Sequence, residues 1–199
     1  LQSYDYEVLT TEQKLTYDIL NDYVSSNRSQ SDYTYYPEIL RPSTGFPAQL
    51  PVLLSEYHFY DRKDVEDYLT LLSLIPSCFD SVLDYETNKI NEGLFLSDTQ
   101  ADTLIADLNT FCDNSSEHYL ITTFRNKVAE LPGLTAEEQA SYCIENEGAF
   151  REYVLPAYEA LRDFLVEHKG SGSNSAGLCY FPDGSDYYAA LVYDATGSS

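Results

Sequence analysis

The sequence predicts an all-α fold, an irregular multi-helix bundle of about seven main helices, with shorter helical segments between them. Three observations predict it. Apolar side chains recur at the spacing of one helix face through most of the 199-residue chain. Capping-box spacings, in which Thr or Ser is followed three residues later by Gln or Glu, begin at Thr10, Ser97 and Thr135. Most Pro and Gly residues fall between these segments, where a helix would end.

The first half of the chain is expected to hold short and medium helices around one irregular excursion. The excursion, residues 28–49, is rich in Pro and Tyr, and we expect at most a short strand or hairpin in it, at Tyr33–Tyr36. Asp61 is placed to cap a helix, and Pro76 is expected to close that helix or to start the next. The expected helices are 10–24, 50–57, 61–75 and 77–91.

The second half is expected to be almost entirely helical. Gly93 predicts a left-handed helix end, and Asn146–Gly148 is expected to break the chain before a long helix that runs to His168. Pro156 lies inside this long helix and predicts a kink, because it has no N–H to donate to residue 152. The expected helices are 97–114, 116 to the Pro132–Gly133 turn, 135–145, 149–168 and one from 185 onward.

The charge of the chain excludes two classes of partner. There are 33 Asp and Glu residues against 11 Lys and Arg, a formal net charge of −22. A nucleic-acid binder needs a basic face toward the phosphates, so nucleic acid is excluded, and anionic membrane surfaces are excluded for the same reason. The longest apolar runs, Leu50–Leu54 and Ala189–Tyr193, are far shorter than a bilayer span, so no transmembrane segment is expected. The 19 tyrosines must supply part of the core.

We expect residues 1–199 to form a single helical domain. A chain of this length buries enough surface to fold without disulfides or metals. The first residue is not methionine and no signal peptide follows it, so we expect the chain to be a portion of a larger protein.

The four cysteines, Cys78, Cys112, Cys143 and Cys179, lack the Cys-x-x-Cys spacing and the nearby histidines of a structural zinc site. Cys78 and Cys112 are equally far from position 95, the middle of the loop between two expected helices. If these helices pack antiparallel, the two thiols meet, either as a disulfide or as free thiols that fill the interface. Cys143 and Cys179 would then pair by elimination.

No catalytic constellation is visible in the sequence. There is no His-x-x-x-His pair, no nucleophile elbow and no phosphate-binding loop. We expect His58 to be packed among aromatics, His118 to be a solvated surface residue and His168 to be a cation at a helix end. Asp183 and Asp186 flank a glycine and are the nearest approach to a calcium site, far from an EF-hand. No catalytic or metal-ligating residue is predicted.

Five segments of the chain carry a family resemblance: Gly45–Tyr57, Asp64–Phe79, Gly93–Asp102, Val154–Leu165 and Gly177–Tyr188. In these segments and their order, the chain resembles the bacterial family called domain of unknown function 885. Members of that family resemble gluzincin-type metallopeptidases, large helical proteins whose zinc helix lies in the C-terminal half, and many are exported lipoproteins. The present sequence corresponds to the N-terminal half and lacks the zinc motif.

The resemblance implies a role but no catalytic residue. The N-terminal helices would form one wall of a substrate cleft, with Gln49, Tyr187 and Tyr188 as the candidates to line it. Tyr187 and Tyr188 are adjacent on a helix, so they cannot both face one groove. No cofactor is expected in this chain, since zinc would lie in the missing C-terminal half. That catalytic half and a peptide substrate are the implied partners, and the implied location is extracellular or anchored at the cell surface as a lipoprotein.

The sequence is compatible with three functions. The leading hypothesis is the non-catalytic N-terminal helical domain of an exported zinc metallopeptidase. The alternative is a stand-alone extracellular module that binds peptide or glycan through the tyrosine-rich excursion, Tyr33–Tyr57. A cytosolic helical scaffold is the third, and it would require four free thiols.

Overall fold

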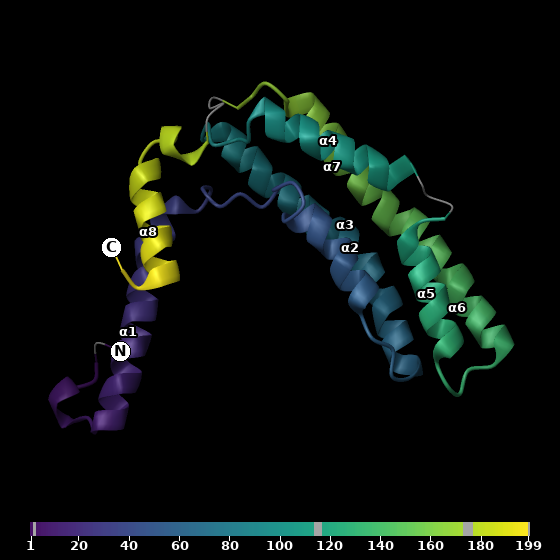
Figure 1. Cartoon of the computed structure of the whole chain (residues 1–199), viewed down its shortest axis with the longest axis horizontal. Coiled ribbons are helices and arrows are strands. Elements are labelled where there is room, and N and C mark those ends of the chain that lie inside the picture. Colours follow the sequence, from purple (N-terminus) through teal and green to yellow (C-terminus); the bar gives the residue numbers. More distant parts are fainter. Residues whose placement is uncertain (2, 114–116, 173–176, 199) are drawn as a thin grey trace. The chain divides into compact units, whose positions relative to one another are not determined.

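The chain folds into helices joined by turns. The computed structural model describes residues 1, 3–113, 117–172 and 177–198, and no strand occurs among them. The predicted all-α, multi-helix architecture is therefore confirmed, and the excursion holds a 3₁₀ turn at Ser31–Tyr33 in place of a hairpin. None of the described helices is long and apolar enough to cross a membrane. The helices are α1 (Thr11–Ser29), α2 (Phe46–Glu56), α3 (Arg62–Asn91), α4 (Asp98–Asp113), α5 (Tyr119–Glu130), α6 (Ala136–Ala149), α7 (Leu155–His168) and α8 (Gly184–Thr196) (Figure 1).

The helices belong to two compact units. The bundle unit, Glu38–Ser175, contains α2 to α7. The small unit joins Leu1–Pro37 to Ala176–Ser199 and contains α1 and α8. The single domain expected over residues 1–199 requires both units to fold as one cooperative body, and it stays a prediction.

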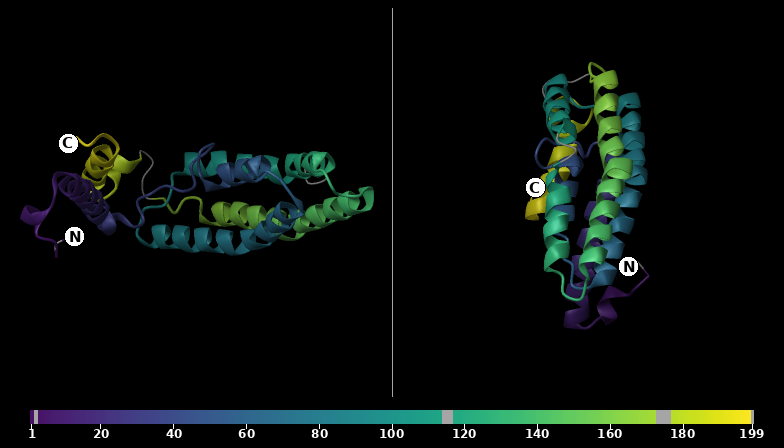
Figure 2. Two further views of the ribbon diagram at one scale, coloured as in Figure 1. Left: turned by 90° about the horizontal axis from the view of Figure 1, so that it is seen from below. Right: turned by 90° about the vertical axis from the view of Figure 1, so that its right-hand side faces the viewer.

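Two long helical rods form the centre of the bundle unit. One is α3, and the other consists of α6 and α7, which are joined without a loop through the π-helical segment Phe150–Val154. Arg62 pairs with Glu138 near one end of the rods, and Phe79 packs on Tyr158 farther along, so the two rods run in the same direction. Figure 2 shows them side by side.

The remaining helices of the bundle unit cover these rods. α4 packs on α7, α5 packs on α6, and α2 lies against α5. Lys169 pairs with Asp102, and Phe111 stacks on Tyr158, so α4 runs antiparallel to α7. Tyrosine contributes to this core as the composition requires, with Tyr68 and Tyr158 almost fully buried. The largest buried apolar side chains are Tyr158, Phe79, Phe95, Phe124, Phe150, Leu40, Leu72, Leu161 and Leu165.

One predicted helix boundary, at Pro76, does not occur. Pro76 lies inside α3, which continues for 30 residues. The proline removes one backbone hydrogen bond, but the buried side chains of Leu72, Ile75 and Phe79 pack on both sides of it and keep the helix in register. Tertiary packing therefore overrides the local signal.

A second predicted boundary, at Asn146–Gly148, is also absent. Gly148 lies inside α6, and Asn146 is buried in the rod. The chain instead departs from α-helical geometry at Phe150–Val154, directly before Pro156 in the first turn of α7. A π-helical turn shifts the hydrogen-bonding pattern of the backbone. Pro156, which has no N–H, therefore lies at a point of the rod where the regular α-helical hydrogen bonds are already interrupted.

The predicted helix ends with a specific cap are confirmed. Reciprocal capping-box hydrogen bonds form at Thr10, Asp61 and Thr135, and the Ser97 hydroxyl accepts from the Gln100 N–H at 3.4 Å. Gly93 follows α3 with a φ of 71°, the left-handed conformation predicted for it. These signals are local, so the sequence alone carries them.

The small unit is held together by polar and aromatic contacts between its helices. The Ser26 hydroxyl of α1 donates to the Asp194 carboxylate of α8 at 2.9 Å. Tyr187 of α8 packs against the rings of Tyr33 and Tyr36 at about 5 Å between centroids. The helix predicted over 10–24 is confirmed as part of α1, but its apolar side chains are exposed: Leu15, Ile19, Leu20, Tyr23 and Val24.

Candidate functional site

Helix α2 positions the candidate site, and a tight turn fixes where α2 begins. A Cβ atom at Gly45 would lie 2.3 Å from the Arg41 nitrogen and 2.7 Å from the Ile39 carbonyl oxygen, so this position requires glycine. α2 then starts before the predicted Leu50, because Pro47 occupies the first turn, where no N–H is needed. The tight turn at Gly45 therefore fixes the position at which α2 begins.

A lysine fixes the other end of α2. The Lys127 ammonium donates to the Tyr57 carbonyl at 2.7 Å and also to the Ser55 carbonyl, two acceptors at the C-terminus of the helix. A cation at this end complements the helix dipole. Burial lowers the pKa of Lys127 from its usual value. Both ends of α2 are thus tied to fixed partners.

The loop before α2 carries a strained residue. Ser43 has a φ of 63°, and the Thr44 N–H donates to the Pro42 carbonyl at 2.8 Å, which makes a three-residue γ-turn of the rare, positive-φ kind. The side-chain amide of Gln49 donates to the Ser43 carbonyl at 3.2 Å. Gln49, a predicted cleft residue, therefore holds this turn in place.

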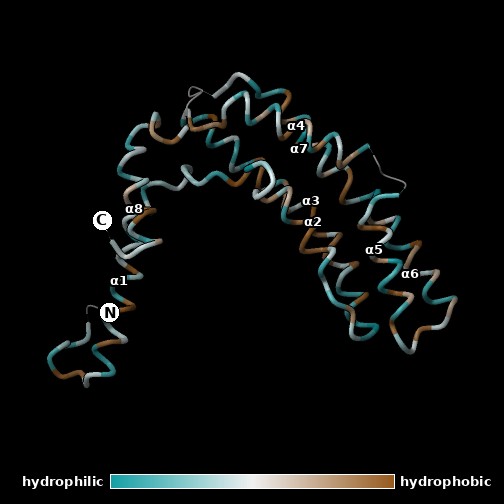
Figure 3. Tube along the Cα trace, viewed as in Figure 1, coloured by the Kyte–Doolittle hydropathy of each residue, from teal (hydrophilic) through white to brown (hydrophobic). Residues whose placement is uncertain are grey.

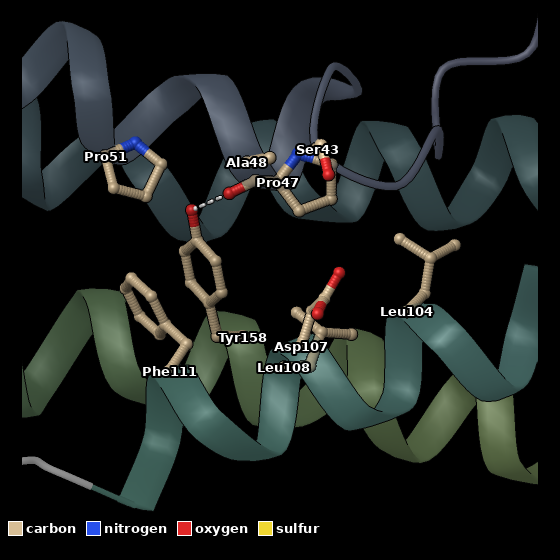
Figure 4. Close-up of a pocket in the computed structure, with 9 residues that line it drawn as sticks. All are labelled: Ser43, Pro47, Ala48, Pro51, Leu104, Asp107, Leu108, Phe111 and Tyr158. Carbon is tan, nitrogen blue, oxygen red and sulfur yellow. Dashed lines mark hydrogen bonds between the residues drawn. The ribbon is translucent and has the colours of Figure 1, made fainter.

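A pocket of about 110 Å³ lies between α2 and α4, with α7 at its base. Figure 4 shows the Tyr158 hydroxyl reaching across to the Pro47 carbonyl, to which it donates at 2.8 Å. The Tyr158 ring is stacked on Phe111 with 3.9 Å between centroids. The lining is almost wholly apolar, and its residues are Ser43, Pro47, Ala48, Pro51, Leu104, Asp107, Leu108, Phe111 and Tyr158.

Asp107 is the one residue with a formal charge among those lining the pocket. Its side chain is on an exposed position of α4, and Figure 4 shows the carboxylate directed from α4 toward α2. No salt bridge among the described residues involves Asp107. The pocket therefore joins an apolar interior to a carboxylate at its edge.

A second open space lies on the other side of α2, against α3. It has a volume of about 290 Å³ and an apolar lining. Leu53 and Leu74 project from the two helices with 64% and 55% of their surface exposed. Figure 3 shows α2 as a largely hydrophobic stretch. We call this space the α2/α3 groove, and its lining residues are Leu50, Leu53, Leu54, Tyr57, Leu71, Leu74, Ile75 and Cys78.

The cysteines expected to meet do not form a disulfide in the structure. Cys78 is a free, exposed thiol in the α2/α3 groove, and Cys112 is a free, half-buried thiol against the core. The expected contact assumed that α3 and α4 pack as a hairpin, whereas α4 packs chiefly on α7. Burial raises the pKa of the Cys112 thiol. Cys143 and Cys179 are free as well.

The other predicted cleft residues lie in the small unit. Tyr187 is buried in the aromatic cluster with Tyr33 and Tyr36. Tyr188 is exposed and borders a shallow pocket of about 380 Å³ with Leu178 and Cys179.

A buried charged cluster was not predicted from the sequence. Lys89 and Glu86 on α3 are 1% and 0% exposed, with 3.6 Å between ammonium and carboxylate. Lys89 pairs more closely with Glu38, at 2.7 Å. Neither Glu86 oxygen has a hydrogen-bond partner among the residues that the structure describes, and burial raises the pKa of Glu86 to about 7. The i, i+3 spacing of Glu86 and Lys89 was the only local signal, and it is typical of exposed helix faces as well.

Two histidines differ from their sequence-based expectations. His118 is buried, not solvated: it caps α5 by accepting from the Leu120 N–H at 3.3 Å, and its ring lies 4.7 Å from that of Phe150. This burial lowers the pKa of His118 to about 4. His58 is exposed and stacks loosely on Tyr60. His168 lies in the last turn of α7, as predicted.

The part of the chain that the structure describes has no group of three His, Cys, Asp or Glu side chains arranged to hold a metal ion. The loop at Asp183 and Asp186 offers no such group either.

The helices and their open apolar surfaces define an all-helical bundle protein. A family model described as "Bacterial protein of unknown function (DUF885)" matches residues 1–199, and the chain belongs to this family. A crystal structure titled as that of the putative lipoprotein from Colwellia psychrerythraea matches with a TM-score of 0.77 at 19% sequence identity. The match covers 82% of this chain and 28% of that chain, so the present chain spans less than a third of that protein. No curated protein matches.

Proposed function

We propose that this chain is the non-catalytic N-terminal helical domain of an exported zinc metallopeptidase and forms one wall of its substrate cleft. The observation that carries the proposal is that α2 borders two open apolar spaces, the α2–α4 pocket and the α2/α3 groove. Isolated globular domains seldom leave large apolar side chains such as Leu53 and Leu74 uncovered on one face. The α2–α4 pocket suits a substrate side chain, and the α2/α3 groove suits packing by further polypeptide.

Further support comes from the family and from the related structure. Membership of the family is consistent with the resemblance to gluzincin-type peptidases carried by segments such as Gly45–Tyr57, the segment that builds α2. The solved relative is titled a putative lipoprotein, which supports an exported location at the cell surface. Its much greater length supports a catalytic half that follows this domain in the same polypeptide, with peptide as the substrate.

The alternative, a stand-alone module that binds peptide or glycan, relied on the tyrosines of the excursion. Tyr33 and Tyr36 instead pack on Tyr187 inside the small unit, and the Tyr36 hydroxyl donates to the Pro182 carbonyl. These rings are used for internal packing, which favours the first proposal.

The test compares residues 1–199 with a longer polypeptide from the same gene. Metal analysis and a peptide-library assay should find zinc and turnover in the longer protein and neither in residues 1–199 alone. Stoichiometric zinc with turnover in residues 1–199 would overturn the proposal. So would a reading frame that contains no zinc helix downstream.

A pair of variants tests the packing role of the α2/α3 groove. Leu53→Glu in the longer protein should weaken the association of the two halves after limited proteolysis, because a carboxylate would be buried against Leu74 and Leu71. Val166→Glu is the matched control, since Val166 is similarly exposed on α7 and lies outside the groove. Equal behaviour of the two variants would contradict a covered groove.

A further inference from the structure

We propose that the α2–α4 pocket binds the N-terminal residue of a peptide, with a branched aliphatic side chain inside the pocket and the free α-ammonium group at Asp107. This inference rests on the proposed function, in which the domain forms a wall of a peptide cleft. It adds the chemical class of ligand and the end of the peptide that is recognised. Size, charge and the supply of hydrogen-bond donors each support it.

The size of the pocket selects the side chain. A dry cavity of about 150 Å³ lined by aliphatic and aromatic side chains accommodates benzene. The α2–α4 pocket is smaller, about 110 Å³, and is lined by Leu104, Leu108, Phe111 and the prolines of α2. A branched side chain of three or four carbons fits such a space, whereas a glycine leaves it empty.

The charge at the edge selects the group next to that side chain. Asp107 is the one formally charged residue of the lining and has no ion-pair partner among the described residues. A carboxylate forms its strongest hydrogen bonds with cationic donors such as an ammonium group. The net charge of −22 adds attraction for cations and repulsion for anions. A peptide N-terminus is favoured over a C-terminus on both grounds.

The walls offer more acceptors than donors, and the Ser43 hydroxyl can serve as either. Pro47 and Pro51 have no backbone N–H, and the Ala48 N–H is used inside the helix, where it donates to the Gly45 carbonyl at 3.1 Å. The Tyr158 hydroxyl already donates to Pro47. A ligand that brings its own donors, as an ammonium does, suits this lining, and a carboxylate that needs donors does not.

The pocket is also held in shape before any ligand binds. Gln49 fixes the strained Ser43 turn at one edge, and the stacked rings of Phe111 and Tyr158 form the opposite wall. Walls that need no rearrangement reduce the ordering cost of binding. Small, weakly binding probes should therefore reveal the site.

The test is a titration of residues 1–199 with three probes, followed by amide chemical shifts in two-dimensional NMR. The probes are L-leucinamide, N-acetyl-L-leucinamide and glycinamide, at about pH 6.5, below the pKa of about 7.7–8.0 of an α-amino group. L-leucinamide should bind saturably, with shifts that cluster on α2 and α4. The acetylated probe, which lacks the charge, and glycinamide, which lacks the side chain, should each bind at least about tenfold more weakly.

Variants locate the interaction. Asp107→Asn should weaken L-leucinamide binding by about tenfold or more, while Asp113→Asn, an exposed carboxylate at the end of the same helix, should leave it unchanged. Ala48→Leu should abolish binding because its side chain fills the pocket. A dispersed NMR spectrum shows that each variant is folded. If all three probes bind equally, or if none binds, the proposal is wrong.

A failure of the pocket proposal can be distinguished from a failure of the proposed function. Suppose that a longer polypeptide contains zinc and cleaves peptides with free and with acetylated N-termini equally well, and that Asp107→Asn does not change this. That result would refute the role of the pocket but would not contradict the proposed function. A longer polypeptide without zinc or turnover would refute the proposed function, even if L-leucinamide binds residues 1–199 as expected.

Discussion

The buried carboxylate of Glu86 gives the sharpest prediction on stability. Its pKa is raised to about 7 by burial, against an ordinary value of 4.5, and neither of its oxygens is hydrogen-bonded to another described residue. Between these two pKa values the folded chain retains a proton that the unfolded chain has released, so this group makes the protein less stable as the pH rises. The difference of about 2.5 pKa units corresponds to about 3 kcal/mol, lost progressively between about pH 4.5 and pH 7.

The substitution Glu86→Gln removes this titration while it preserves the shape of the side chain. The free energy of unfolding of both proteins is measured with urea at pH 4.5 and at pH 8.5. The value for the variant minus the value for the wild type should be about 3 kcal/mol higher at pH 8.5 than at pH 4.5. Lys89 keeps its partner Glu38, so the variant does not leave an unpaired cation. Glu92→Gln, at the exposed end of the same helix, is the control and should show no such change. A wild-type-to-variant difference that is the same at both pH values would refute the assignment of Glu86 as a buried acid.

Three further predictions concern packing and backbone geometry. Tyr158→Phe should cost about 1 kcal/mol in chemical denaturation, because it removes one buried hydrogen bond and leaves the ring in place; no measurable loss would contradict that bond. Gly45→Ala should destabilise by more than about 3 kcal/mol or prevent folding, since the added methyl would overlap the Arg41 backbone, and a variant with wild-type stability would refute the tight turn. Leu161→Ala should cost about 2–5 kcal/mol, whereas Ile19→Ala should stay within about 0.5 kcal/mol, because only Leu161 is buried; thermal denaturation of both variants checks this contrast.

Much of the fold was predictable because its signals are local. Thr10, Asp61, Ser97 and Thr135 cap helices in the structure as their spacing predicts. Gly93 adopts the left-handed conformation expected of a glycine at a helix end. Each signal involves side chains and backbone within one helical turn, so no distant partner can alter it.

The candidate site was less predictable because it depends on distant contacts. Gln49 was a cleft candidate from the family resemblance, whereas its hydrogen bond to Ser43 depends on the path of the loop. Asp107 looks like any other acid of a helix in a chain with 33 of them, and only the packing of α4 beside α2 brings it to the edge of a pocket. Tyr187 was a cleft candidate whose burial in the small unit no periodicity could indicate.

Prolines and histidines show where tertiary structure prevailed over local preference. Pro76 was expected to interrupt a helix, but the core on both sides of it keeps α3 continuous. His118 was expected at the surface, but α5 places it among Phe111 and Phe150, where an uncharged imidazole is favoured. In both cases burial contributes more free energy than the local signal.

The sequence by itself determined the helices, their caps and the acidic charge, since these follow from residue type and short-range spacing. It also carried the resemblance that assigns the family. The tertiary structure alone decided which apolar faces are covered. The stripe that contains Ile19 on α1 and the one that contains Leu53 on α2 are exposed, while an equally apolar stripe on α7 is buried. The physical reason is that periodicity specifies an apolar face on a helix, but burial requires a second surface, and residues far apart in the chain supply it.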